Sequence, residues 1–224
     1  DQPSHPWLTI AINNITDTQV DIALERSEVY DRLTGSNFHF DNLSNQETLG
    51  YIIMDSGVIG NLRANGNSRI DFESSYYTNS VDGWSDGCND HSFAGTYSGT
   101  PIAVATKSSH NEADGGWLRE CSVNASRIQL TIDEDDDQDG ERSHATEDTS
   151  LLVFSNIFFY DSEAATSLES SDTLMLETNF ASLAPNSFTT INFEQVYEFP
   201  PAVFILEDNE NPEPSSIRIR NITE

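Results

Sequence analysis

Three copies of one strand-like phrase set the strongest constraint on how this chain folds. The phrase reads WLTIAINNIT from Trp7, returns as WLRECSVNAS from Trp117, and ends the sequence as IRIRNIT from Ile217. Each copy contains a short alternating run followed by Asn-x-Ser/Thr, and alternation with a period of two is typical of a half-buried β-strand. Self-similarity of this kind indicates a chain built from repeated structural units.

The segments between these phrases repeat as well, and they predict five strand types per unit. Short apolar or alternating runs bounded by turn-forming residues lie at 20–24, 49–54, 68–76, 101–105, 128–132, 147–154, 190–197 and 201–205. Polar, irregular segments at 25–48, 78–99 and 157–186 are expected to be loops. Because no segment shows helical periodicity, we predict an all-β chain of antiparallel β-sandwich units in tandem.

The order of the strand types predicts one complete unit between two incomplete ones. Residues 1–62 form the C-terminal half of a unit, residues 63–160 a complete unit, and residues 161–224 the N-terminal half of another. A half sandwich leaves open edges, so we expect 161–224 to be completed by residues 1–62 of the same or a neighbouring chain. Both halves contain the repeated phrase, which favours head-to-tail assembly or a fragment of a longer repeat polypeptide.

The charge of the chain argues against several classes of partner. Ten Lys and Arg residues face 38 Asp and Glu residues, which gives a formal charge of −28. A field this negative repels phosphate backbones and anionic lipids, so we expect neither nucleic acid nor a membrane surface as a partner. No apolar run approaches the roughly 20 residues of a membrane span, so we expect no membrane insertion. It suits a protein surrounded by divalent cations or salt, and solubility alone is the alternative explanation.

Cysteines and glycosylation motifs favour a secreted or cell-surface protein. Cys88 and Cys121 are expected to form one disulfide that ties the long loop 78–99 to the second copy of the phrase, with two free thiols as the alternative. Asn-x-Ser/Thr sites begin at Asn14, Asn42, Asn124 and Asn221. These sites are candidates for N-glycosylation, and strand-end turns are an equally good interpretation.

One acidic segment has the pattern of a calcium loop. The candidate ligands are Asp133, Asp135, Asp137, Asp139 and Glu141. Calcium takes six to eight oxygen ligands, and alternating carboxylates before Gly140 can supply several of them from one loop. The twelfth loop position is Thr146 rather than glutamate, so the segment is not a full EF-hand. A solvated acidic hairpin is the alternative.

Aromatic residues in and before the long loop are candidates for sugar binding. Tyr76, Tyr77 and Trp84 can offer ring faces and Asp86 a hydrogen-bonding carboxylate, although an aromatic interface or a self-packed loop is the alternative. The histidines are scattered, and no nucleophile elbow, phosphate-binding loop or His-Glu-x-x-His motif is present. We therefore expect no enzymatic activity.

The order of three C-terminal phrases resembles the H-type lectin domain. These are INFEQVY from Ile191, PPAVF from Pro200 and the closing IRIRNIT. The resemblance implies a six-stranded antiparallel sandwich and, in sugar-binding members, an aromatic site at a trimer interface. The family's last-strand tryptophan corresponds to Tyr51 and Leu151 here. The opening phrase, with ALERSE and ETLGYI, is similar to related repeats in large bacterial surface proteins associated with mannose-sensitive pili.

Taken together, these features predict a non-enzymatic, extracellular or cell-surface repeat protein with a structural or adhesive role. We expect it to bind copies of itself head to tail in a fibre or stalk, with calcium as the cofactor. The alternatives are a carbohydrate-binding lectin module, whose partners are glycans, and an accessory domain of a secreted polysaccharide-degrading enzyme.

Overall fold

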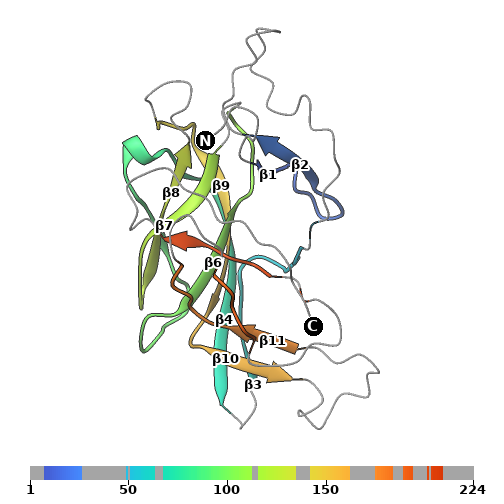
Figure 1. Ribbon diagram of the computed structural model, residues 1–224, viewed down its shortest axis with the longest axis vertical. Helices are drawn as coiled ribbons and strands as arrows, with labels where there is room; N and C mark the ends of the chain where they lie inside the picture. The colour runs from blue at the N-terminus through green and yellow to red at the C-terminus, as the bar shows by residue number, and fades with distance from the viewer. Residues whose placement is uncertain are drawn as a thin grey trace, which may run out of the picture.

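The computed structural model describes the central part of the chain and several flanking segments (Figure 1). The described residues are 8–26, 49, 51–63, 68–112, 116–134, 142–161, 175–183, 189–193, 201 and 203–208. They contain β-strands and one short 3₁₀ helix, and no α-helix. The all-β prediction is therefore confirmed. None of the described segments contains a helix that is long and apolar enough to cross a membrane.

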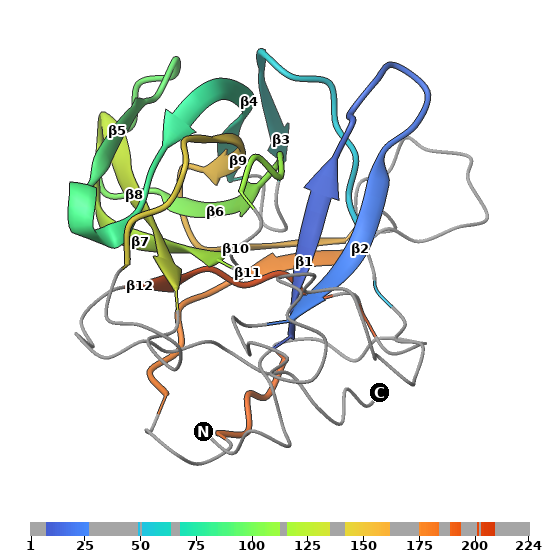
Figure 2. The same ribbon diagram turned by 90° about the horizontal axis from the view of Figure 1, so that it is seen from above.

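Two four-stranded sheets face each other (Figure 2). The first has the order β12-β7-β8-β5, formed by β5 Asn89–Ser92, β7 Gly116–Asn124, β8 Arg127–Glu134 and β12 Glu207–Asp208. The second has the order β3-β4-β9-β6, formed by β3 Val58–Arg63, β4 Arg69–Val81, β6 Ile102–Lys107 and β9 Glu147–Phe154. Neighbouring strands are antiparallel, except that β12 runs parallel to β7.

The core lies between the sheets because alternate residues of each strand point inward. The β8 residues Ile128, Leu130 and Ile132 are fully buried, and they pack in one cluster with Leu151 and Val153 of β9. Burying each such side chain stabilises the fold by about 1.5–3 kcal/mol. A second cluster, formed by Ile70, Phe154 and Phe158, lies on the opposite face of β9, because Phe154 follows Val153 and successive side chains alternate between the faces.

Two smaller hairpins complete the described structure. β1 Leu8–Asn13 pairs with β2 Asp21–Arg26, and β10 Phe158–Asp161 pairs with β11 Met175–Thr178. The first hairpin joins the opening phrase to the following run, as the sequence predicts. The second copy of the phrase pairs in the same way, since β7 and β8 are antiparallel neighbours.

Several predicted boundaries are wrong. The described residues 49 and 51–54 form no strand, and Tyr51 and Ile53 are 67% and 74% exposed. The strand begins instead at Val58, after a turn. The apolar alternation typical of a strand is interrupted in this segment by Gly60. A glycine is needed there because a Cβ atom would lie only 2.7 Å from the ring of Phe72.

The loop predictions are also wrong in part. Segment 78–99 contains the end of β4, the 3₁₀ helix η2 Trp84–Asp86 and β5. β5 escapes recognition because its sequence, NDHS, has no apolar alternation. Segment 157–186 contains β10 and β11, whereas residues 189–193 and 203–205 form no strand. Residues 194–200 and the third phrase, 217–223, lie outside the described residues.

Candidate functional site at the charged end of the sandwich

Strand β8 ends in two buried carboxylates that point to opposite faces. Its inward residues continue by alternation from Ile132 to Glu134, so Asp133 lies on the outer face. Both carboxylates belong to residues that are 0% exposed. A buried charge is costly unless it is paired, so the neighbours of these two acids define the chemistry of this end of the molecule.

On the outer face, Asp133 is held by two arginines. Its Oδ2 accepts a hydrogen bond of 2.6 Å from Nη1 of Arg119, and its Oδ1 accepts one of 2.8 Å from Nε of Arg142. The guanidinium carbons lie 5.3 Å and 4.1 Å from the ring centroid of Trp84. Arginine stacked on an aromatic face gains cation–π attraction. Trp84 therefore covers a compact, charge-paired cluster.

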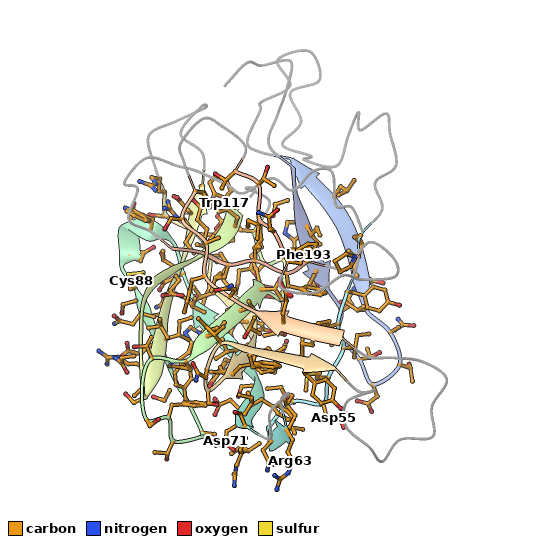
Figure 3. The ribbon with its side chains drawn as sticks, turned by 60° about the horizontal axis from the view of Figure 1, so that its bottom comes forward. Asp55, Arg63, Asp71, Cys88, Trp117 and Phe193 are labelled. Carbon is orange, nitrogen blue, oxygen red and sulfur yellow. A yellow bond between two sulfur atoms is a disulfide. The ribbon has the colours of Figure 1, made fainter. Side chains whose placement is uncertain are left out.

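A disulfide fixes this arrangement to the sheet. Cys88 follows η2, and Cys121 lies where the β7–β8 register shifts between Glu120 and Ser122. The two cysteines are bonded to each other, which is the pairing expected from the sequence. The bond holds the turn that carries Trp84 against β7; Figure 3 labels Cys88 on this side of the molecule, with Asp71 and Arg63 at the opposite end.

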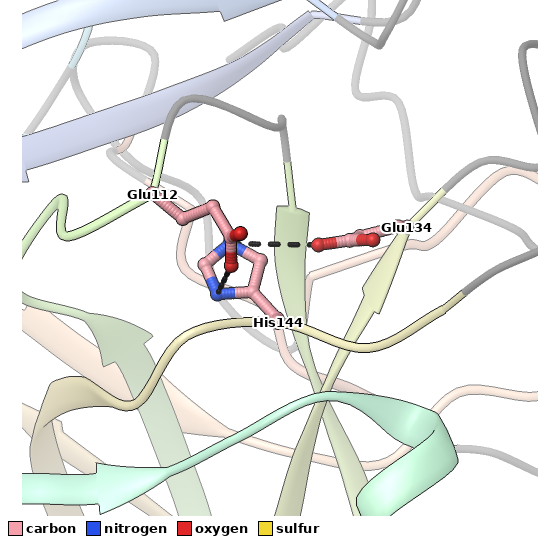
Figure 4. A group of neighbouring side chains, drawn as sticks. All are labelled: Glu112, Glu134 and His144. Atoms are coloured by element: carbon pink, nitrogen blue, oxygen red, sulfur yellow. Dashed lines mark ion pairs between the residues drawn. The ribbon is translucent and has the colours of Figure 1, made fainter.

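On the inner face, Glu134 belongs to a cluster around one imidazole (Figure 4). Oε1 of Glu134 lies 3.7 Å from Nε2 of His144, and Oε2 of Glu112 lies 3.8 Å from Nδ1. Oε1 of Glu147 lies 4.0 Å from the same Nδ1. Glu112 follows β6, Glu147 begins β9, and His144 precedes it. The cluster therefore joins segments of both sheets.

A hydrogen bond to the backbone orients the ring of His144. The ring Nδ1 lies 2.8 Å from the carbonyl oxygen of Ala145. Because a carbonyl only accepts hydrogen bonds, Nδ1 carries a proton. Nε2 is buried and has no hydrogen-bond partner among the described residues. The residue is 5% exposed, so this nitrogen lies inside the protein rather than in solvent.

Two glycines make room for this segment. A Cβ atom at Gly83 would lie 2.2 Å from the backbone nitrogen of His144. One at Gly116 would lie 2.6 Å from Cγ2 of Ile132 and 3.2 Å from Nε2 of His144. The ring position therefore depends on the missing side chain of Gly116.

The calcium prediction is only partly within the described residues. Asp133 lies in the structure and is engaged by Arg119 and Arg142, as described above. Asp135, Asp137, Asp139 and Glu141 lie outside the described residues. The calcium loop therefore stays a prediction, and its first residue is already held by two guanidinium groups.

The four candidate sugar-binding residues have separate surroundings. The hydroxyl of Tyr76 donates to Asp148, and burial together with this carboxylate raises the pKa of Tyr76 to about 12. Tyr77 donates to the carbonyl of Ser92 at 2.7 Å and faces the core, where burial raises the pKa of its hydroxyl. Trp84 contacts the arginines, and Asp86 is exposed. No recorded contact among the described residues joins the four into one site.

The described Asn-x-Ser/Thr sites both lie at exposed strand ends. Asn14 has a left-handed backbone conformation, with φ of 50°. Its side-chain Nδ2 donates a hydrogen bond of 2.7 Å to Oδ2 of Asp21. Oδ1 of Asn124 accepts a hydrogen bond of 2.9 Å from the backbone nitrogen of Ser126, as in a tight turn. Turn formation is thus observed at both positions, and glycosylation stays a prediction. Asn42 and Asn221 lie outside the described residues.

The sequence contains one signal that could have revealed the inner cluster. The inward positions of β8 and β9 continue from apolar residues to Glu134 and Glu147, where alternation alone leads one to expect further apolar side chains. Glu112 and His144 carry no such signal, because both lie outside the strands. Comparisons of the chain with known protein families, curated proteins and solved structures found no match.

Proposed function

We propose that this chain is a non-enzymatic, secreted or cell-surface β-sandwich protein with a structural or adhesive role, whose flanking segments bind copies of itself. One observation carries the proposal. Large exposed apolar side chains are concentrated in the segments that flank the central sandwich.

The contrast along the chain is sharp. Within residues 58–156, the described residues include two exposed large apolar side chains, Ile59 and Tyr76. The described flanking residues with this property are Ile10, Ile15, Ile22, Leu49, Tyr51, Ile52, Ile53, Met54, Ile157, Phe180, Leu183, Ile191, Phe204 and Ile205. Residues 51–54 place four of these side chains in succession, and a contiguous exposed apolar patch is typical of protein–protein interfaces.

A second copy is the occupant that the sequence favours. The flanking segments contain the same strand phrases as the central sandwich, so complementary strands are available on a neighbouring chain. The disulfide supports an oxidising, extracellular setting. Within this proposal the sandwich is one H-type-lectin-like unit of a tandem array, and calcium bound at residues 133–141 stiffens the assembly.

The proposal is tested by the mass of the purified chain in solution. We expect end-to-end oligomers by light scattering and filaments by electron microscopy in calcium, and shorter species after chelation. Ile53→Asp places a charge in the apolar segment and should shift the population to monomers. Ser98→Asp, at an exposed polar position of the sandwich, is the matched control. A monomer at all concentrations, with or without calcium, would contradict the proposal.

A carbohydrate-binding module is the second candidate, and one pocket favours it. The pocket has a volume of about 240 Å³ and lies at the N-terminal end of β4. Its lining includes Asn61, Arg69, Asp71, Phe72 and Tyr97. Aromatic faces beside short polar groups are what sugar rings and their hydroxyls require. A glycan array in which the wild type binds and Asp71→Ala does not would establish this function.

A further inference from the structure

The inner cluster gathers three carboxylates around one imidazole. Glu112, Glu134 and Glu147 all lie within 4.0 Å of His144, and the last two are 0% exposed. Lys107 of β6 is also buried, and it pairs in register with Thr149 on the inward face. Buried charges are normally paired or bound to a metal ion.

The geometry points to a metal site, and we propose that Glu112, Glu134 and His144 together bind one divalent transition-metal ion of the Zn²⁺ type. The ligand atoms of these residues lie within 4.8 Å of one another. The buried Nε2 of His144, which has no hydrogen-bond partner among the described residues, is an independent indication of a ligand, because it lies 3.7 Å from Oε1 of Glu134. The proposal goes beyond the structural or adhesive function and does not depend on it.

The distances suit such an ion after a small contraction. Tetrahedral zinc with bonds of about 2.0–2.2 Å requires ligand atoms roughly 3.3–3.5 Å apart. Nε2 of His144 and Oε1 of Glu134 are already 3.7 Å apart. Oε2 of Glu112 lies 3.8 Å from Nδ1, so this side chain, which is 31% exposed, must rotate toward Nε2 to bind the same ion. The fourth position is left for water or another ligand.

The surrounding hydrogen bonds hold the three ligands in place. The Nδ1–H bond to the carbonyl of Ala145 orients the ring, and the backbone nitrogen of Ala145 donates to Glu112. Glu147 accepts a hydrogen bond of 2.7 Å from the backbone nitrogen of Asn111, next to Glu112. Glu147 is therefore a positioning residue. Such outer contacts fix ligand orientation in metal sites and strengthen binding.

The ligand set selects the class of metal. Calcium takes oxygen ligands only, six to eight of them, whereas imidazole suits zinc and other transition metals. The proposed ion thus differs from the calcium predicted for residues 133–141. It would connect the segment after β6, the end of β8 and the segment before β9, and close the end of the sandwich interior.

Calorimetric titration of the chelator-treated full chain with Zn²⁺ tests the proposal. We expect one ion per chain and a higher unfolding temperature with Zn²⁺ than without it. Glu112→Gln and His144→Gln should each raise the dissociation constant for Zn²⁺ by about tenfold or more. Asp137→Asn is the matched control, since it removes one charge from the acidic loop and leaves the three ligands intact. Calcium at the same concentration should not compete.

The variants separate this site from general attraction of cations to an acidic chain. If His144→Gln fails to fold, Glu112→Gln decides, because its side chain reaches the surface and glutamine keeps its volume. The absence of Zn²⁺ binding in the wild type would overturn the proposal. So would binding that survives Glu112→Gln unchanged, or that is lost only in Asp137→Asn, which would place the ion in the acidic loop.

Discussion

Arg119 and Asp133 form an ion pair that is closed to solvent, with 2.6 Å between Nη1 and Oδ2 and both side chains 0% exposed. Asp133→Ala would leave this guanidinium and that of Arg142 without their shared carboxylate. Removing one partner of a buried pair destabilises a protein by about 3–5 kcal/mol. We expect a loss of that size in the free energy of unfolding, measured in urea.

The control for this prediction is a pair on the surface. Asp90 and Arg127 lie 2.8 Å apart, and their side chains are 49% and 43% exposed. Exposed pairs contribute about 0–1 kcal/mol, so Asp90→Ala should cost little. Equal losses in Asp90→Ala and Asp133→Ala would show that burial of the Arg119 pair has no energetic consequence.

The disulfide predicts a second loss of stability. Replacing Cys88 and Cys121 by serine opens a loop with a sequence separation of 33. In the chain-entropy description a closed loop of that size stabilises by about 3–4 kcal/mol. Chemical unfolding of the double serine variant should show this decrease, and wild-type protein in a strong reductant should match it. A wild type that is indifferent to reductant would contradict the prediction.

Gly116 should tolerate no side chain. In Gly116→Ala the new methyl group would meet Ile132 and the ring of His144. Overpacking of this kind costs about 1–3 kcal/mol, which thermal or chemical unfolding would detect. Gly99→Ala is the control, because a Cβ atom there meets nothing within 4 Å. If the two alanine variants are equally stable, the packing described around Gly116 is incorrect.

His91 should make stability depend on pH. Burial lowers the pKa of His91 below its usual value of 6.5, opposed by its hydrogen bond to the carbonyl of Asn89 and by the charge of Asp90. The unfolded chain therefore takes up the proton first as the pH falls. The contribution of His91 is complete above the unfolded pKa and is lost as the pH falls through the folded pKa.

The difference between the wild type and His91→Gln isolates this effect from the many carboxylates. Unfolding in urea at about pH 7.5 and about pH 5 should show a larger acid-induced loss for the wild type than for the variant. The same loss in both proteins would mean that the folded structure does not disfavour the charged ring.

The sequence predicted strands where alternation and apolar character coincide. The run at 147–154 becomes β9, and the phrase from Trp117 pairs with the run at 128–132. The described residues 49 and 51–54 of the predicted apolar strand form no strand, and their side chains lie at the surface of the described structure. β3 was missed since Gly60 and Asn61 interrupt its apolar pattern.

The disulfide was predictable because only two cysteines were present, whereas the inner cluster was not. Glu112, Glu134 and His144 come from three segments, and their proximity depends on how two sheets face each other. No spacing in the sequence encodes that contact. In a chain with 38 acidic residues, the sequence also does not distinguish the few buried glutamates from the many acidic residues that are expected on the surface.

The position of charge along the sandwich implies an order of events during folding. The middle of the molecule contains Leu130 and Val153, which can condense with little directional requirement. The end that holds Arg119 and Asp133 must shed water from both ions, and it is rewarded only when their hydrogen bonds are in place. We therefore expect the apolar centre to collapse first, and the end with the buried ion pair to pack only after that core has formed.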